Sequence, residues 1–388
     1  MGSLRHRAGD RRPARRRRAA EAVGLLAGFA LDHLVGDPRR GHPVAAFGRA
    51  AAALERRLYA PARSAGALHT ALAVGAPVAA AAAVAALTRR SPAARALAVA
   101  VTTWTVLGGR SLRREAAAMA DALERADLSA ARARLSHLCG RDPATLDAAG
   151  LARATVESVA ENTSDAVVAP LFWGAVAGLP GLAGYRAANT LDAMVGHRSP
   201  RYARFGTPAA RLDDALNLLP ARLTGLLTVA AAPLGRTGTP PPGPPGLRAR
   251  PPGDGAAGRD ADARRVVRAG GAGRAGEAGR IGEAWRVWRR DRADHPSPNA
   301  GQCEAAMAGA LGVRLGGRNV YHGRSEVRPL LGDGPRPDAA HIRAAARICG
   351  VVGLAAALGA AAARAVPWRV AGGRTAVRSG RRAGGSLR

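Results

Sequence analysis

Long apolar segments alternate with polar, charge-rich segments along this chain. Residues 67–87 contain no Asp, Glu or Arg and come close to the roughly 20 residues that a helix needs to cross a bilayer. Weaker apolar segments lie at 19–36, 95–108, 166–184, 216–235 and 348–363. The pattern predicts an all-α, polytopic integral membrane protein with about four to six embedded segments. A soluble helical protein with an alanine-rich core is the alternative.

The polar segments divide the chain into five expected parts. Residues 110–160 place charged and apolar side chains at helical spacing, which is typical of amphipathic helices outside the membrane. Low-complexity Pro, Gly and Arg sequence fills a later segment. We therefore expect a disordered Arg-rich leader (1–18), a membrane-embedded catalytic region (19–235), a disordered insertion (236–280), a region with a catalytic motif and a membrane helix (281–366), and a disordered tail (367–388).

The composition removes several classes of function. The formal net charge is +30, but all 58 basic residues are arginine and nucleic-acid recognition motifs are missing, so we expect no nucleic-acid partner. Without lysine the chain cannot form a GxxxxGK[ST] phosphate loop or a pyridoxal Schiff base. Cys139, Cys303 and Cys349 lie far apart without a CxxC pair, so neither a disulfide framework nor a zinc site is expected.

The first candidate site is the acidic stretch ESVAENTSD, which leads into an apolar segment. Glu157, Glu161 and Asp165 are spaced at i, i+4 and i+8, so in a helix their carboxylates share one face, with Asn162 beside them. Like charges placed this way repel each other, and a bound cation would remove that repulsion. A structural glutamate paired with a neighbour such as Arg153 is the alternative.

Asparagine and aspartate recur three residues apart beside apolar segments. The pairs are Asn162 with Asp165, Asn189 with Asp192, and Asp214 with Asn217, and Asp213 precedes the last pair. A single such pair is most often a helix cap or a solvated face. Three pairs offer the oxygen ligands that suit Mg²⁺ carrying a polyphosphate. The arginines expected to bind phosphate oxygens nearby are Arg186, Arg211 and Arg222.

Two more polar stretches have the same character. The run GDPRRGHPVAAFG joins Asp37 and His42 in a loop rich in turn-forming residues. In the run HPSPNAGQCEAAM, His295 is followed by Asn299 near an expected helix start and by Glu304 in the first turns. Either histidine alone is more often a packing or turn residue, whereas the polar neighbours favour a functional site.

Together these stretches resemble the adenosylcobinamide-phosphate synthase family of cobalamin biosynthesis, the CbiB/CobD-type membrane proteins. The matching runs are GDPRRGHPVAAFG (36–48), GRSL (109–112), GRDPATL (140–146), VESVAENTSDAVVAPLFW (156–173), ANTLDAMVGHRSPRYARFGTPAARLDDALNLLPARL (188–223) and HPSPNAGQCEAAMAGALGVRLGG (295–317). They occur in the order of the family and cover most of the chain between residues 20 and 335. The leader and the insertion depart from the family pattern.

The resemblance implies a multi-pass enzyme of the cytoplasmic (inner or plasma) membrane. It implies an ATP-dependent C–N ligase that joins (R)-1-amino-2-propanol, or its O-phosphate, to adenosylcobyric acid, giving adenosylcobinamide or its phosphate. The implied partners are these substrates, the lipid bilayer and other membrane enzymes of the pathway, with Mg²⁺ as cofactor and ATP as co-substrate. A membrane Mg²⁺-dependent prenyltransferase-like enzyme and a transporter with embedded acidic residues are the alternatives.

The candidate residues fall into three groups. For catalysis we expect Asp37, His42, Glu157, Glu161, Asn162, Asp165, Asp192 and Asp214; for binding of substrate or ATP, Arg186, Asn189, Arg211, Asn217, Arg222, Asn299 and Glu304; and for Mg²⁺, Glu161, Asp165, Asp192, Asp213 and Asp214. In the expected mechanism, the γ-phosphoryl group passes to a propionate of the corrinoid, and the amine attacks the resulting acyl phosphate.

The segment 166–184 is expected to be broken or re-entrant. Pro170, Gly174, Gly178 and Pro180 interrupt it, and irregular backbone is tolerated at membrane depth where protein covers it. Such a break would let the polar motifs on its two sides meet. Nearly every loop is rich in arginine, so the positive-inside rule does not fix the orientation of the chain.

Overall fold

A computed structural model describes residues 11–37, 41–144, 146–197, 199–235, 276–321 and 324–366. The predicted tail, and the insertion up to residue 275, lie outside these residues. Among the described residues the regular structure is helical except for one antiparallel hairpin of β1 (Leu315–Tyr321) and β2 (Arg324–Leu331). The all-α prediction is therefore confirmed for the helices, and the hairpin is the exception.

The helices of the described residues are, in chain order, α2 (Arg11–Leu34), α3 (Pro43–Leu58), α4 (Arg63–Leu87), α5 (Pro92–Val106), α6 (Gly109–Glu124), α7 (Leu128–Leu135), α8 (Ala148–Thr163), α9 (Ala169–Leu191), α10 (Tyr202–Phe205), α11 (Thr207–Ala230), α13 (Glu277–Asp291), α14 (Ala300–Leu311) and α15 (Ala339–Ala365). Two π-helical turns, η2 (Ser164–Val168) and η3 (Asp192–Gly196), flank α9. The 3₁₀ turns are η1 (Thr88–Arg90) and η4 (Ala232–Gly235). Regular structure thus extends into the expected leader at α2 and into the expected insertion at α13.

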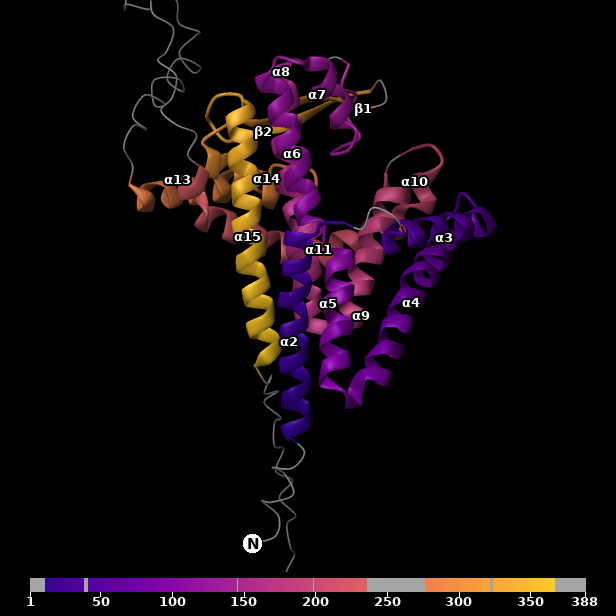
Figure 1. Ribbon diagram of the computed structural model, residues 1–388. Coiled ribbons are helices and arrows are strands. Elements are labelled where there is room, and N and C mark those ends of the chain that lie inside the picture. Colours follow the sequence, from indigo (N-terminus) through magenta and orange to yellow (C-terminus); the bar gives the residue numbers. More distant parts are fainter. Residues whose placement is uncertain are drawn as a thin grey trace, which may run out of the picture.

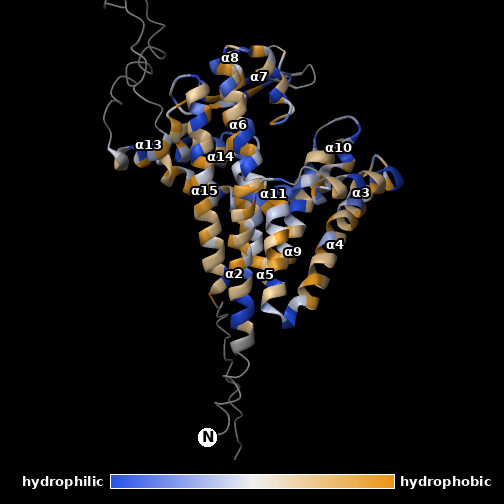
Figure 2. Cartoon of the chain, in the orientation of Figure 1, coloured by the Kyte–Doolittle hydropathy of each residue, from blue (hydrophilic) through white to orange (hydrophobic). Residues whose placement is uncertain are grey.

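The helices form a lower bundle and an upper polar layer (Figure 1). The lower bundle contains α2, α4, α5, α9 and α15, whereas α7, α8 and the β hairpin lie above it. Apolar residues dominate the lower bundle, and hydrophilic residues are concentrated above it (Figure 2). Large apolar side chains of α4 face outward, since Leu68, Leu72 and Leu87 are 50%, 48% and 83% exposed. An apolar outer surface beneath a polar layer is the arrangement expected of a membrane protein.

Within the part of the chain that the structure describes, three stretches are long and apolar enough to cross a membrane, namely Arg63–Arg90, Ala148–Gly196 and Ala339–Ala365. They support a membrane protein, although they are fewer than the predicted embedded segments. α2 and α5 also run through the lower bundle (Figure 1). α2 begins with an arginine-rich turn, and α5 has only 15 residues, so neither belongs to this set.

The longest of these stretches folds back on itself at Gly178. The backbone there has φ 64° and ψ −141°, a conformation open to glycine and avoided by residues with a side chain. Asn189 Nδ2 lies 3.4 Å from Asp165 Oδ2, 24 residues away in sequence. A straight helix of that length would separate the two residues by about 36 Å. The prediction of a broken segment is therefore confirmed, and α9 consists of two half-helices whose outer ends meet, which we call the re-entrant hairpin.

A buried ion cluster holds the tip of this re-entrant hairpin. Glu21 of α2 lies 3.4 Å from Arg95 of α5 and 2.8 Å from Arg364 of α15. Arg364 also donates to the carbonyl oxygens of Ala175 and Val176, at the end of the first half-helix. Its cation offsets the negative C-terminal end of that half-helix. Three helices thereby fix how deeply the hairpin enters the bundle.

Gly178→Ala is expected to destabilise the protein. An added Cβ at this positive φ is strained and would lie 3.1 Å from Arg364 Nη2, so the free energy of unfolding should fall by about 1–3 kcal/mol. The measurement is the midpoint of thermal unfolding in detergent. Gly359→Ala is the matched control on α15, because its Cβ would meet nothing within 4 Å, and its midpoint should stay or rise. An unchanged midpoint for Gly178→Ala would show that the reversal does not depend on glycine.

Candidate functional site

Polar side chains from η2, α9 and α11 meet at the open end of the re-entrant hairpin. The Asn189 amide donates to Asp165 Oδ2 at 3.4 Å and to Asp213 Oδ1 at 3.3 Å. Asn217 Nδ2 donates to Asp213 Oδ2 at 3.1 Å, and the Tyr185 hydroxyl donates to Asn217 Oδ1 at 2.9 Å. We call Asp165, Asn189, Asp213 and Asn217 the mouth cluster. Residues predicted from three separate motifs thus lie together.

The mouth cluster carries more negative than positive charge. Asp165 interacts electrostatically with Asp213, Glu161 and Asp192. Burial raises the pKa of Asp213, and the hydrogen bonds from the two asparagines offset this effect only in part. Arg186 is a cation that interacts with Asp165. Carboxylate and amide oxygens with an excess of negative charge suit a hard divalent cation such as Mg²⁺.

Arg186 offers an unused hydrogen-bond donor beside this cluster. Its Nε is buried and has no hydrogen-bond partner among the residues that the structure describes. The guanidinium interacts electrostatically with Asp37 as well as with Asp165. A buried donor without a partner is costly, and a phosphate oxygen would satisfy it. The mouth cluster and Arg186 together fit a magnesium-bound polyphosphate.

The three carboxylates of α8 and η2 do not all face the mouth cluster. Each step of four residues turns a helical side chain by about 40° beyond a full turn, so Asp165 points about 80° away from Glu157 on an ideal helix. Asp165 joins the mouth cluster, whereas Glu157 and Glu161 line a separate pocket. Glu161 lies between the two positions and interacts electrostatically with Asp165.

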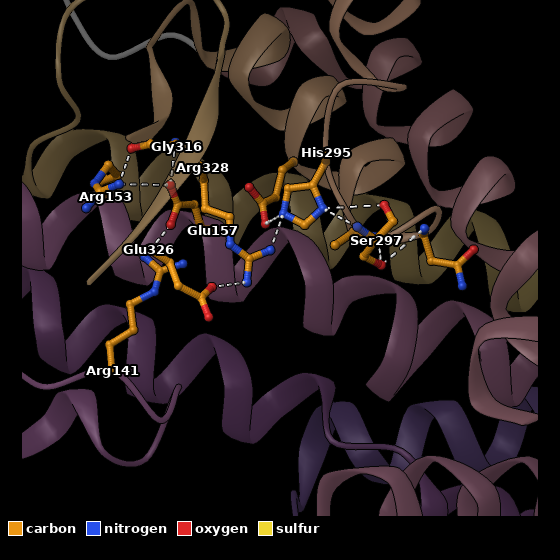
Figure 3. Close-up of polar contacts among 11 residues, drawn as sticks. Arg141, Arg153, Glu157, His295, Ser297, Gly316, Glu326 and Arg328 are labelled. Carbon is orange, nitrogen blue, oxygen red and sulfur yellow. Dashed lines mark hydrogen bonds and ion pairs between the residues drawn. The ribbon is translucent and has the colours of Figure 1, made fainter. Parts of the chain in front are cut away.

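This second site, the α8 pocket, has a volume of about 290 Å³. Its wall comes from the loop before α8, from α8 itself, from the segment leading into α14, from α14 and from the β hairpin. The charged and amide side chains of the wall are Arg141, Glu157, Glu161, His295, Glu304, Asn319 and Arg328. Arg141, Glu157, Arg328 and His295 converge in Figure 3. The pocket therefore combines guanidinium groups with carboxylates.

Glu157 is committed to the framework of the α8 pocket. Its Oε1 accepts from the Gly316 backbone N–H at 2.6 Å and lies 3.7 Å from Arg153 Nη1, and its Oε2 pairs with Arg141 (Figure 3). Arg153 also donates to the carbonyl oxygens of Gly316 and Arg318. These contacts tie the β hairpin to α8 and to the loop before it. They favour the structural alternative for this glutamate.

Glu161, His295 and Glu304 form the acidic part of the pocket. His295 Nε2 lies 3.7 Å from Glu304 Oε1 and 3.3 Å from Arg328 Nη1, and the Ser297 N–H donates to His295 Nδ1 at 3.0 Å. Burial and the neighbouring Glu161 carboxylate raise the pKa of Glu304 well above its ordinary value. Burial lowers the pKa of His295. One ligand atom of each of the three lies within 4.8 Å of the others, so they can share a proton or a cation.

Some of the remaining predicted residues border the mouth cluster. Asp192 interacts electrostatically with Asp213 and Asp214. Asn299 Nδ2 donates to the backbone carbonyl of Asp214 at 2.8 Å, although the Asp214 side chain itself is exposed. Asp37 reaches the site through its interaction with Arg186. The structure thus brings Asp37 and Asn299, which come from two further motifs, to the same place as the three motifs of the mouth cluster.

Other predicted residues make local contacts instead. His42 Nδ1 accepts from Val44 N–H at the start of α3. Asn162 donates to the Ser158 carbonyl within its own helix. Arg222 donates to the Leu218 carbonyl one turn earlier on α11, and Arg211 is exposed. Within the described part of the chain, neither of these arginines contacts the mouth cluster.

Sequence reasoning assigned no role to Tyr185, Arg141, Asn319 or Arg328. Arg141 lies inside the run GRDPATL, which marks its motif but does not indicate its function. Asn319 and Arg328 belong to the β hairpin, which was not predicted. The available signal was the pair of short segments RNVY and RSEV around a glycine-containing turn, a pattern typical of hairpins.

Known proteins resemble this chain over most of its length. The family described as CobD/Cbib protein matches residues 25–349. The Cobalamin biosynthesis protein CobD of Mycobacterium tuberculosis is 49% identical over 338 residues, which are 87% of this chain and 94% of that protein. Proteins of the same name from Geobacter metallireducens and Stutzerimonas stutzeri are 42% and 41% identical over 321 and 320 residues, covering 81% and 82% of this chain and 87% and 90% of those proteins. No solved structure matches the chain significantly.

Proposed function

This chain belongs to the CobD/Cbib protein family, and we propose that it acts in cobalamin biosynthesis as an ATP-dependent amide ligase of the cytoplasmic membrane. The reaction joins the amine of 1-amino-2-propanol, or of its O-phosphate, to a propionate carboxylate of adenosylcobyric acid. Family membership and the names of the relatives support the pathway. The reaction itself is supported by the sequence resemblance and by the chemistry of the two sites.

Two chemically different sites lie next to each other along one helix, and this adjacency carries the proposal. The mouth cluster offers oxygen ligands and the unused donor of Arg186. The α8 pocket offers carboxylates and guanidinium groups around a small cavity. Glu161 lines the pocket and interacts electrostatically with Asp165 of the mouth cluster. An amide ligase needs such a pair, one site where a carboxylate is phosphorylated and a neighbouring site that holds the amine.

The chemistry proceeds in two steps. A propionate oxygen takes the γ-phosphoryl group of ATP, and ADP leaves. The amine nitrogen then attacks the acyl phosphate carbonyl, so that the C–N bond forms, the C–O bond to phosphate breaks and inorganic phosphate leaves. The ammonium form of the amine first gives one proton to Glu161, which lines the pocket on the side of the mouth cluster, so that the nitrogen has a free electron pair for the attack. The second proton leaves with the inorganic phosphate.

Asp165 and Asp213 of the mouth cluster, together with the bordering Asp192, would hold Mg²⁺. When bound, the ion supplies positive charge that neutralises the phosphate oxygens of ATP. Arg186 donates to the same oxygens, because its buried Nε otherwise lacks a partner within the described residues. Asn217 holds Asp213 in place by its hydrogen bond.

The release of ADP tests this proposal. With the full chain purified in detergent or lipid, ADP and phosphate should appear only when adenosylcobyric acid and aminopropanol, or its phosphate, are both present. Mass spectrometry should find one amide bond per ADP. ADP release without the corrinoid, or without a mass gain of the corrinoid, would contradict a ligase. A prenyltransferase would release pyrophosphate from a prenyl diphosphate, and a transporter would leave the corrinoid unchanged.

A further inference from the structure

The wall of the α8 pocket carries charges of both signs. Arg141 lines the pocket and pairs with Glu157, which is 1% exposed, and Arg153 reaches the same carboxylate from outside the lining. Arg328 adds a second guanidinium, and its partner Glu326 is 53% exposed. An ion pair of this exposure is weak, so Arg328 can exchange Glu326 for a ligand. Part of the wall is therefore suited to an anionic group.

The rest of the wall is suited to a cationic group. Glu161 lies so close to Glu304 that its carboxylate disfavours the charged form of Glu304. Asn319 lines the same cavity, is 2% exposed, and has its Oδ1 buried without a hydrogen-bond partner among the described residues. A buried acceptor without a partner is costly. A ligand group with several hydrogen-bond donors would satisfy Asn319 and separate the two carboxylates.

The size of the cavity limits the ligand. A volume of about 290 Å³ corresponds to roughly ten water molecules at about 30 Å³ each. A corrinoid is therefore too large to enter the pocket, which fits a small substrate.

We propose that the α8 pocket binds the amine substrate as a dipolar amino-alcohol phosphate, with its ammonium group against Glu161 and Glu304 and its phosphate against Arg328 and Arg141. This inference rests on the proposed function and assigns its smallest substrate. An ammonium group has three donors, which match the two carboxylates and the Asn319 carbonyl oxygen. A guanidinium group binds phosphate oxygens in pairs. The amine then lies beside the mouth cluster, where the acyl phosphate forms.

A metal ion held by Glu161, His295 and Glu304 is the competing occupant. Arg328 Nη1 lies 3.3 Å from His295 Nε2. The guanidinium therefore occupies the side of this nitrogen at which a metal ion would bind. Its positive charge would also repel the ion. A singly charged ammonium group, placed between the carboxylates and away from the guanidinium, avoids that conflict.

Binding of small probes to the full-length protein, without ATP or corrinoid, tests the assignment. In isothermal titration calorimetry, aminopropanol O-phosphate should bind at least about tenfold more tightly than 1-amino-2-propanol or 2-propyl phosphate, because each of these lacks one charged contact. Glu304→Gln should remove the preference over 2-propyl phosphate, and Arg328→Gln the preference over the free amino alcohol. The matched controls are Glu283→Gln and Arg314→Gln, exposed residues outside the pocket that should leave both preferences intact.

The three probes test the assignment on the unchanged protein, so a variant that fails to fold does not decide the result. Equal binding of all three probes would overturn the assignment, as would preferences that survive both pocket substitutions. Saturable Mn²⁺ binding that is lost in Glu304→Gln, with no binding of the amine, would assign these residues to a metal. Normal ligation by a protein without probe preference would refute the pocket and keep the proposed function. Selective binding of the probe without ligation would support the pocket assignment and refute the proposed function.

Discussion

Asp165→Asn and Asp213→Asn should each lower the rate of corrinoid amidation by at least about a hundredfold, the usual loss when one preorganised charge is removed from an active site. The Asn189 side-chain amide donates a hydrogen bond to each of the two carboxylates, so both carboxylates lie next to the same NH₂ group. Loss of either charge weakens the attraction for a magnesium-bound polyphosphate. The measurement is the initial rate of ADP release at increasing Mg²⁺ concentrations, and the concentration needed for half-maximal rate should rise with the loss of rate.

Neither substitution should unfold the protein. Asparagine has nearly the size of aspartate, and removing one of two neighbouring carboxylates relieves the repulsion between them. The midpoint of thermal unfolding in EDTA should therefore stay or rise. Asp294→Asn, at an exposed position, is the control that should leave both the rate and the midpoint unchanged. A wild-type rate in Asp165→Asn or Asp213→Asn would remove that carboxylate from the site.

The mouth cluster could be predicted in outline from the sequence. Asp165, Asn189 and Asn217 stand out because polar residues with Mg²⁺ chemistry recur beside apolar segments. The glycines and prolines of the segment between them indicated the reversal at Gly178 that brings them together. The sequence could not show which of two adjacent aspartates faces the site. Neighbouring residues of a helix point about 100° apart, so the rotation of α11 against α9 decides that Asp213 is buried.

The α8 pocket could not be predicted in the same way. Glu157 accepts a hydrogen bond from the backbone of Gly316, 159 residues later in the chain. No local sequence pattern specifies which strand packs against which helix. The two-stranded hairpin is short, and its sequence signal is correspondingly weak. Its Gly316 and Gly317 have φ 81° and 88°, which permits the irregular register at the start of β1. The long-range packing of this hairpin therefore places Asn319 and Arg328 in the pocket, where no sequence motif indicates them.

Glu157→Gln is expected to destabilise the protein by about 3 kcal/mol, the typical cost of breaking one side of a buried ion pair. The substitution leaves the guanidinium groups of Arg141 and Arg153 without their shared carboxylate. The link between α8 and the Gly316 backbone also weakens. The midpoint of thermal unfolding in detergent should drop by several degrees, with or without Mg²⁺. In a double-mutant cycle, Arg153→Gln should lower the free energy of unfolding less in the Glu157→Gln variant than in the unchanged protein, because the two side chains lie 3.7 Å apart.

Glu161→Gln, one turn further along α8, should have the opposite effect on stability. Glu161 faces Glu304 and Asp165 rather than an arginine pair, so removing its charge relieves repulsion worth a few tenths of a kcal/mol per pair. The midpoint of thermal unfolding in EDTA should stay or rise slightly. Amidation should slow, because the pocket loses its proton acceptor and one of its two acidic side chains that bind the ammonium group. Glu157→Gln and Glu161→Gln are thus each other's matched control. If both variants lost stability equally, Glu161 would be structural as well, and if Glu161→Gln kept full activity and an unchanged Mg²⁺ requirement, it would have no place in the site.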